Sequence, residues 1–196
     1  VMYSCTGNYK YWKTFSIDEK KLFFIPCAVD NNFFRENAES KKSSVAKIKQ
    51  NFELNEPLAI IIYASKFIKR KNPILLFDAY ASLSKDGSAP PSAYLVYVGD
   101  GIERIEIEKR VIDRGWQSHV KLIGFVNQSE LPAYFAMSDI FVLPSSKEPF
   151  GLVINEAMSA GNAIISIDEV GATRDLIRHG ENGYICKAGD LNQMIS

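Results

Sequence analysis

Short runs of apolar residues alternate with longer amphipathic stretches from Leu58 to the end of the chain. Each run has the length of a β-strand and is rich in branched or aromatic side chains, whereas the stretches between the runs carry apolar residues at helical intervals. The expected strands are 58–63, 94–98, 120–123, 140–143, 163–167 and 183–186, and the expected helices lie at about 73–85, 102–114, 129–137, 150–160 and 172–178.

This order of strands and helices predicts the α/β fold class. Parallel strands need crossover connections, which are right-handed, and strands that are apolar throughout need helices on both faces. The sequence therefore predicts a Rossmann-like, doubly wound parallel sheet of about six strands.

The first 34 residues follow a different pattern, which we interpret as a connector. Leu22-Phe-Phe-Ile25 is expected to form a short strand, and residues 36–51, polar and rich in Lys and Ser, indicate a peripheral helix or a flexible excursion. We expect residues 1–20 to be poorly packed in isolation, or held by another copy of the chain, because they would leave apolar surface uncovered. Their aromatic residues are Tyr3, Tyr9, Tyr11, Trp12 and Phe15.

Charge and composition narrow the class of ligand. The chain has 196 residues, of which 46% are hydrophobic, and its 23 Lys and Arg are balanced by 23 Asp and Glu. This length is sufficient for one globular domain. A dedicated nucleic-acid binder needs accumulated positive charge, so zero net charge favours small or neutral ligands and argues against a nucleic-acid partner.

Cysteine usage and hydropathy indicate a cytoplasmic protein. The three cysteines show neither a disulfide framework nor zinc-ligand spacing. The longest apolar run, 58–64, is far shorter than the roughly 20 residues that span a bilayer, and no signal peptide opens the chain. The chain begins with Val1, and we expect it to be a piece of a longer protein.

Ligands of open α/β sheets bind beyond the carboxyl ends of the strands, so the loops there are the candidate sites. The first, Ser65-Lys-Phe-Ile-Lys-Arg-Lys-Asn72, holds four basic residues beside a helix start near Pro73. The free N–H groups at a helix start favour anions, which indicates a phosphate site. Taken alone, such a run of bases is also typical of a solvated loop.

The second loop contains Gly99-Asp-Gly101, half of a GxGxxG fingerprint. Arg104 occupies the third glycine position, and no acidic residue follows at the distance expected of a ribose ligand. We interpret this segment as a tight turn into a helix, which argues against a classical NAD site.

Two glutamates eight residues apart, Glu148 and Glu156, follow the fourth strand. Pro149 and Gly151 predict a helix start near Phe150, so the first glutamate belongs to the loop and the second to the helix. Carboxylates suit hydroxyls, free amides suit phosphate, and Gly151 lets a ligand approach the backbone. The segment predicts a phosphorylated, hydroxyl-rich ligand such as a nucleotide sugar, and an exposed helix charge is the alternative for either glutamate alone.

The loop after the fifth strand runs from Asp168 to Asp175, and a close approach to ligand or an ordinary turn would explain its glycine equally well. Asp168-Glu169 is the one acidic pair that could hold a metal. Since no DxD-type motif accompanies it, we expect none. His119 and His179 each stand alone, which favours structural or surface roles.

Together these segments resemble the C-terminal, donor-binding domain of GT-B fold retaining glycosyltransferases (glycosyltransferase group 1, family 4-like). The most specific one, Glu148-Pro-Phe-Gly-Leu-Val-Ile-Asn-Glu156-Ala-Met-Ser-Ala-Gly161, is similar to the family's E-x7-E stretch. Cys27-Ala-Val-Asp-Asn-Asn-Phe33 is similar to the interdomain linker. The resemblance implies that residues 1–34 are a remnant of the N-terminal domain with the linker, and that residues 35–196 form the nucleotide-sugar domain.

The resemblance also implies roles for individual residues. Lys66, in place of the family's usual Arg, and Lys71 would bind the donor diphosphate beside Ser65, which replaces a Gly. Glu148 would contact sugar hydroxyls and Glu156 the ribose. The expected catalytic residues are Lys66, Lys71 and Glu148, and the expected substrate-binding residues are Ser65, Phe125, Val126, Phe150, Gly151, Leu152 and Glu156.

The implied reaction moves a sugar from a nucleoside diphosphate sugar to an acceptor hydroxyl with retention, in polysaccharide, glycan or glycolipid synthesis. Fixed cations would take the place of a metal, and no cofactor besides the donor is expected. The implied partner is an N-terminal acceptor domain of the same protein, without which this fragment would be inactive, and only the full-length enzyme would associate peripherally with membranes. A GT-B-like epimerase or phosphorylase, a non-catalytic nucleotide-sugar module and an oxidoreductase on the same fold stay open as alternatives.

Overall fold

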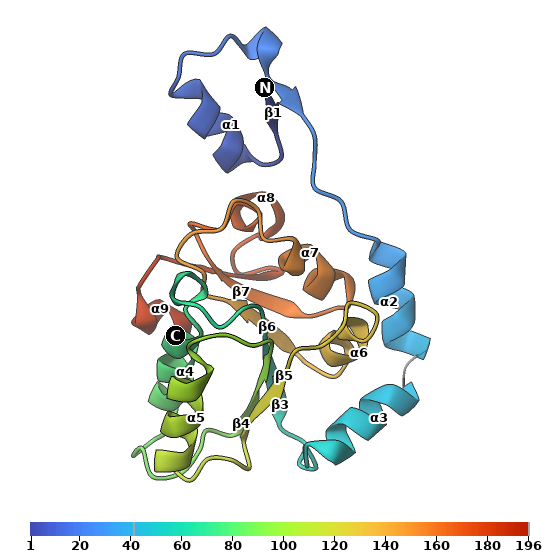
Figure 1. Cartoon of the computed structure of the whole chain (residues 1–196), viewed down its shortest axis with the longest axis vertical. Coiled ribbons are helices and arrows are strands. Elements are labelled where there is room, and N and C mark those ends of the chain that lie inside the picture. The colour runs from blue at the N-terminus through green and yellow to red at the C-terminus, as the bar shows by residue number, and fades with distance from the viewer. Residues whose placement is uncertain (41, 196) are drawn as a thin grey trace.

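Six parallel strands form the centre of the structure, in the spatial order β5-β4-β3-β6-β7-β8 (Figure 1). This computed structural model describes residues 1–40 and 42–195. The chain runs outward from β3 to β5, returns to the other side of β3, and runs outward again to β8, so the expected doubly wound sheet is confirmed. The strands are β3 (Ala59–Ala64), β4 (Ala93–Val98), β5 (Val120–Gly124), β6 (Ile140–Leu143), β7 (Ala163–Ile167) and β8 (Gly183–Cys186), each within one residue of its expected bounds.

Helices cover both faces of this sheet (Figure 1). One face carries α4 (Pro73–Ser82), α5 (Arg104–Asp113) and α9 (Leu191–Ile195). The other carries α6 (Leu131–Ala136), α7 (Leu152–Ser159) and α8 (Thr173–Leu176). The expected helices are all present, and α7 begins two residues later than predicted because Gly151 has φ +95°, outside the helical region.

The core has two layers because side chains alternate across each strand. Along β3, Ile60 and Ile62 pack with Ile154 of α7, whereas Tyr63 packs with Phe77 of α4. Each fully buried apolar side chain of this size contributes roughly 1.5–3 kcal/mol relative to leaving it exposed.

Two helices, α2 (Asn31–Ser40) and α3 (Lys42–Asn51), precede the sheet, where a peripheral helix or a flexible excursion was expected. The Asp30 carboxylate accepts a hydrogen bond from the Phe33 amide at 2.9 Å, which supports the start of α2. Phe34 is 3% exposed, and its ring lies 6.1 Å from that of Phe135 in α6. Residue 34, where the boundary was expected, lies inside α2, which packs against α6 and α7, and the division of the chain into two parts stays a prediction.

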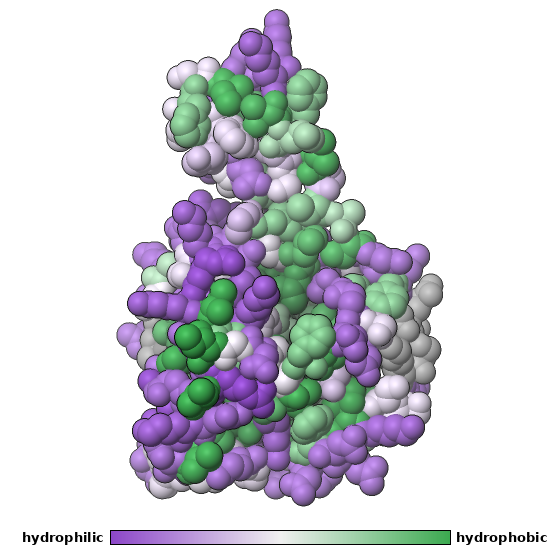
Figure 2. Space-filling view, in the orientation of Figure 1, coloured by the Kyte–Doolittle hydropathy of each residue, from purple (hydrophilic) through white to green (hydrophobic). Residues whose placement is uncertain are grey.

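The N-terminal segment forms a small lobe at the top of the molecule (Figure 1). It contains β1 (Met2–Tyr3), α1 (Thr6–Lys13), a 3₁₀ turn (Glu19–Lys21) and β2 (Phe23–Phe24), the short strand expected there. Hydrophobic side chains gather on its surface (Figure 2), and association through this surface stays a prediction. The residues that are at least half exposed are Met2, Tyr11, Phe15, Phe23, Phe24 and Ile25.

Candidate functional site

The strand order places the candidate site between β3 and β6. These strands are neighbours, and the chain leaves them in opposite directions across the sheet, so a crevice opens beyond their carboxyl ends. The loops that follow them, residues 65–72 and 144–151, meet at this point. The Asn72 side-chain amide donates to the Pro144 carbonyl at 3.0 Å and ties one loop to the other.

The loop after β4 supports the 65–72 loop from the side. A Cβ atom at Gly99 would lie 2.0 Å from the Ser65 carbonyl oxygen, and one at Gly101 would lie 2.5 Å from that of Phe67. Both glycines also have positive φ. Close packing against residues 65–67 therefore requires these two glycines. The sequence analysis explained them only by a tight turn.

Lys71 and Glu148, expected in one site, form an ion pair across the two loops. The Lys71 ammonium contacts the Glu148 Oε2 atom, and Arg70 Nη1 lies 3.3 Å from the same oxygen. The Lys71 and Glu148 side chains are only 13% and 15% exposed. Partial burial makes their attraction stronger than that of a pair in water.

Ser65 and Lys66 belong to the same loop but not to this ion pair. Lys66 is exposed, and the structure gives it no ion-pair partner among the described residues. Its carbonyl accepts a hydrogen bond of 2.9 Å from the Tyr63 hydroxyl. Burial raises the pKa of Tyr63, so this hydroxyl stays protonated and holds the loop in place. The Lys66 side chain is exposed in the loop that follows β3.

Glu156 lies on α7 and has a neutral partner. The Gln128 side-chain amide donates to its Oε1 atom at 3.0 Å. Burial raises the pKa of Glu156, and the hydrogen bond from Gln128 offsets part of that rise. The sequence analysis did not identify Gln128 as a partner of Glu156. The position of Gln128 two residues after Val126, at the carboxyl end of β5, was the available signal.

The remaining expected substrate-binding residues lie on two loops. Phe125 is 79% exposed and Val126 is half-buried, directly after β5. Phe150, Gly151 and Leu152 stand at the start of α7, and among the described residues their N–H groups find no hydrogen-bond acceptor. Gly151 is buried, and a Cβ there would lie 2.9 Å from Val170 Cγ1, so packing by itself accounts for a glycine here, and the expected approach of a ligand stays a prediction.

The carboxylate of Asp168, the first member of the acidic pair considered for a metal, already interacts with other groups of the protein. Its carboxylate accepts from the Ala188 amide at 3.2 Å and lies 3.8 Å from Arg174 Nη2. Over residues 1–40 and 42–195, no group of three His, Cys, Asp or Glu side chains is arranged to hold a metal ion.

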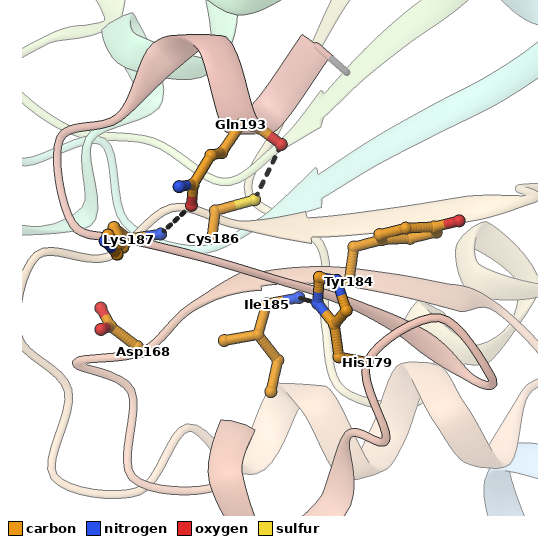
Figure 3. Close-up of a pocket in the computed structure, with 7 residues that line it drawn as sticks. All are labelled: Asp168, His179, Tyr184, Ile185, Cys186, Lys187 and Gln193. Carbon is orange, nitrogen blue, oxygen red and sulfur yellow. Dashed lines mark hydrogen bonds between the residues drawn. The ribbon is translucent and has the colours of Figure 1, made fainter.

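A cavity of about 440 Å³ beside Asp168 runs along β8 at the edge of the sheet (Figure 3). Here the Ile185 amide donates to His179 Nδ1 at 3.1 Å, and the Lys187 amide donates to Gln193 Oε1 at 2.8 Å. His179 therefore has the structural role expected of a lone histidine. The residues that line the cavity are Asp168, His179, Tyr184, Ile185, Cys186, Lys187 and Gln193.

A second cavity, of about 570 Å³, separates α1 from the loops that carry Glu148 and Asp168. The lobe is anchored beside it, since the Thr6 amide donates to the Asp175 carboxylate at 2.8 Å and Asn8 donates to the Pro149 carbonyl at 3.4 Å. Glu148 therefore borders an open space on the side that faces the N-terminal lobe.

A family model described as glycosyl transferases group 1 matches residues 44–195. The chain belongs to this family. It is 33% identical over 159 residues to N-acetyl-alpha-D-glucosaminyl L-malate synthase of Bacillus anthracis, which covers 81% of this chain and 40% of that protein. It is 29% identical over 182 residues to a GDP-mannose-dependent alpha-(1-6)-phosphatidylinositol monomannoside mannosyltransferase of Mycobacterium tuberculosis, covering 88% of this chain and 44% of that protein.

Solved structures show the same fold. Anabaena HepE in complex with UDP superposes with a TM-score of 0.83 at 23% identity, over 100% of this chain and 51% of that one. A glycosyltransferase from Rickettsia africae superposes with a TM-score of 0.84 at 19% identity, again over 100% and 51%. The expected family and the expected half of a GT-B fold are thus confirmed, and the chain spans about half the length of these relatives.

Within the described part of the chain, no helix is long and apolar enough to cross a membrane.

Proposed function

We propose that this chain binds a nucleoside diphosphate sugar and forms the donor half of a retaining glycosyltransferase, which moves the sugar to an acceptor hydroxyl. The observation that carries the proposal is the ion pair between Lys71 and Glu148 in the crevice beyond the carboxyl ends of β3 and β6. A cation for phosphate and a carboxylate for sugar hydroxyls lie side by side there. The names of relatives support this assignment, among them a lipopolysaccharide core biosynthesis glycosyltransferase and the GDP-mannose-dependent mannosyltransferase.

The described residues suit the parts of such a donor. Lys66, Lys71 and the free amides at the start of α7 would stabilise the negative charge that develops on the departing diphosphate. Glu148 would orient the sugar through its hydroxyls, and Glu156 would accept hydrogen bonds from the ribose.

The base and the acceptor would be bound elsewhere. Phe125 and Val126 lie beyond β5, where they would border the base. The acceptor site would come from an N-terminal domain of the same protein, connected through residues 27–33. The cysteines, all unpaired, are consistent with a cytoplasmic enzyme.

A thermal-shift panel of UDP, GDP and ADP and their sugars tests the proposal. A donor at about 100 times its dissociation constant should add roughly 2.7 kcal/mol of stability, which raises the unfolding midpoint by several degrees. Residues 1–196 alone should transfer no sugar. An unchanged midpoint with every nucleotide at millimolar concentration would contradict the donor role, and sugar transfer by this chain alone would contradict the need for an acceptor domain.

A further inference from the structure

We infer that Arg70 is a positioning residue, which holds Glu148 in place while Lys71 binds the donor diphosphate. This role rests on the proposed donor-binding function. It assigns separate tasks to two adjacent cations that reach the same carboxylate oxygen.

Arg70 contacts three consecutive residues of the opposite loop. Its carbonyl accepts from the Ser146 amide at 3.0 Å and from the Ser146 hydroxyl at 3.2 Å. Its Nη1 atom donates to the Lys147 carbonyl at 2.8 Å and lies 3.3 Å from Glu148 Oε2. Both the backbone and the side chain of Arg70 are thus bound to the loop that carries Glu148.

The chemistry of the guanidinium fits this task. Arginine presents several donors in a rigid planar fork, so one side chain can bind a carbonyl and a carboxylate at the same time. Lysine has a single ammonium on a flexible stem, which can leave one partner for another. Lys71 therefore suits the exchange from carboxylate to phosphate, and Arg70 suits the fixed contact.

The distribution of contacts on Glu148 supports the same division. Both cations reach Oε2, and among the described residues no hydrogen bond reaches Oε1. That second oxygen is available for a sugar hydroxyl. If Lys71 moved to the diphosphate and Arg70 were absent, the carboxylate would lie uncompensated near a second negative group, which is unfavourable where water is partly excluded.

A double-mutant cycle with Glu148 tests this role. The variants are Arg70→Gln, Glu148→Gln and the double variant, and the ligands are UDP, GDP, UDP-glucose and GDP-mannose. We expect Arg70→Gln to weaken binding of the preferred sugar nucleotide about tenfold, and less than about twofold when Glu148 is already replaced. Arg70→Lys should restore binding only in part, because it keeps the charge and loses the fork.

Arg178→Gln is the matched control. Arg178 also pairs with a glutamate, Glu181 at 2.9 Å, but lies in the connection between α8 and β8. Unfolding midpoints without ligand verify that each variant folds, and the bond from Asn72 to Pro144 keeps the loops tied without Arg70.

Three results would overturn the assignment. Equal weakening with and without Glu148 would make Arg70 a direct donor ligand, and no weakening in either background would remove its role altogether. Failure of the unaltered chain to bind any of the four nucleotides would overturn the proposed function, and the role of Arg70 with it.

Discussion

Glu148 and Glu156 lie eight residues apart, and the structure surrounds them with partners of opposite character. Glu148 sits in a loop and receives two cations, Arg70 and Lys71, on one oxygen. Glu156 sits in a helix and receives one neutral amide, from Gln128. Two carboxylates of the same motif therefore differ in charge balance and in the freedom of their side chains.

Under the proposed function, this difference would let one residue type recognise two parts of a ligand. Cations that contact a carboxylate offset its repulsion from a nearby diphosphate. A carboxylate in a half-buried position with one amide partner lacks donors, and the hydroxyls of a ribose would supply them. Each prediction below changes one side of this comparison.

The largest effect should come from Lys71→Met, which removes the cation expected to bind phosphate. We expect binding of nucleoside diphosphates to weaken by about 2–3 kcal/mol, the upper part of the range for a hydrogen bond to a charged group. Titration calorimetry measures the loss. Lys109→Met is the control, because Lys109 is 69% exposed and pairs with Asp113 on the surface. Equal affinities for Lys71→Met and the control variant would remove Lys71 from the phosphate site.

Replacing the glutamates by alanine should separate their roles. Glu156→Ala should weaken nucleotide and sugar nucleotide alike by about 1–3 kcal/mol, through lost ribose hydrogen bonds. Glu148→Ala should spare the free nucleotide and weaken the sugar nucleotide by a similar amount. Dissociation constants for UDP with UDP-glucose, and for GDP with GDP-mannose, measure the contrast. If both variants lost both ligands equally, the two roles would not be distinct.

Gln128→Ala should have a smaller effect, because it removes one hydrogen bond at an exposed side chain. We expect nucleotide binding to weaken by about 0.5–1.5 kcal/mol. The pKa of Glu156 should rise further, since the hydrogen bond from Gln128 lowers it. Carboxyl chemical shifts followed over a pH titration report that pKa. Gln117→Ala, an exposed amide before β5, should change neither quantity.

The smallest effect should be a pH dependence of stability. Burial raises the pKa of Glu156 in the folded chain, so the folded state holds this proton more tightly than the unfolded state does. The resulting stabilisation is complete below the unfolded pKa and is lost as pH rises through the folded pKa. Relative to Glu156→Gln, the unaltered chain should therefore lose unfolding free energy as the pH rises from below the ordinary glutamate pKa toward neutrality. Urea unfolding across that range measures it, and parallel curves for the two proteins would contradict it.

Much of the fold was predictable from the sequence because burial on both faces makes each strand a continuous apolar run. Ile140 to Leu143 and Ala163 to Ile167 matched their expected bounds for this reason. The start of α2 was missed because its sequence is mostly polar. Its position depends on the Asp30 cap and on a contact between Phe34 and Phe135, which lies far along the chain.

The candidate site was predictable only in its general location. Strand order brings the loops of Lys71 and Glu148 together, and their motifs indicate phosphate and hydroxyl chemistry. Arg70 and Gln128 were not predicted as partners of the two glutamates, because they lie 78 and 28 residues away from them. Such pairings are set by how the loops pack in three dimensions.

Hydrogen bonds within the chain already occupy part of the outer edge of β8, and this has a consequence for how the protein behaves at high concentration. Cys186 directs its carbonyl toward β7, so the hydrogen-bonding groups of Gly183 and Ile185 point away from the sheet. The Gly180 amide already bonds the Gly183 carbonyl, and His179 already accepts from Ile185. A strand from another molecule would have to break these bonds before it could pair there. This rim therefore resists the edge-to-edge growth by which exposed sheets aggregate.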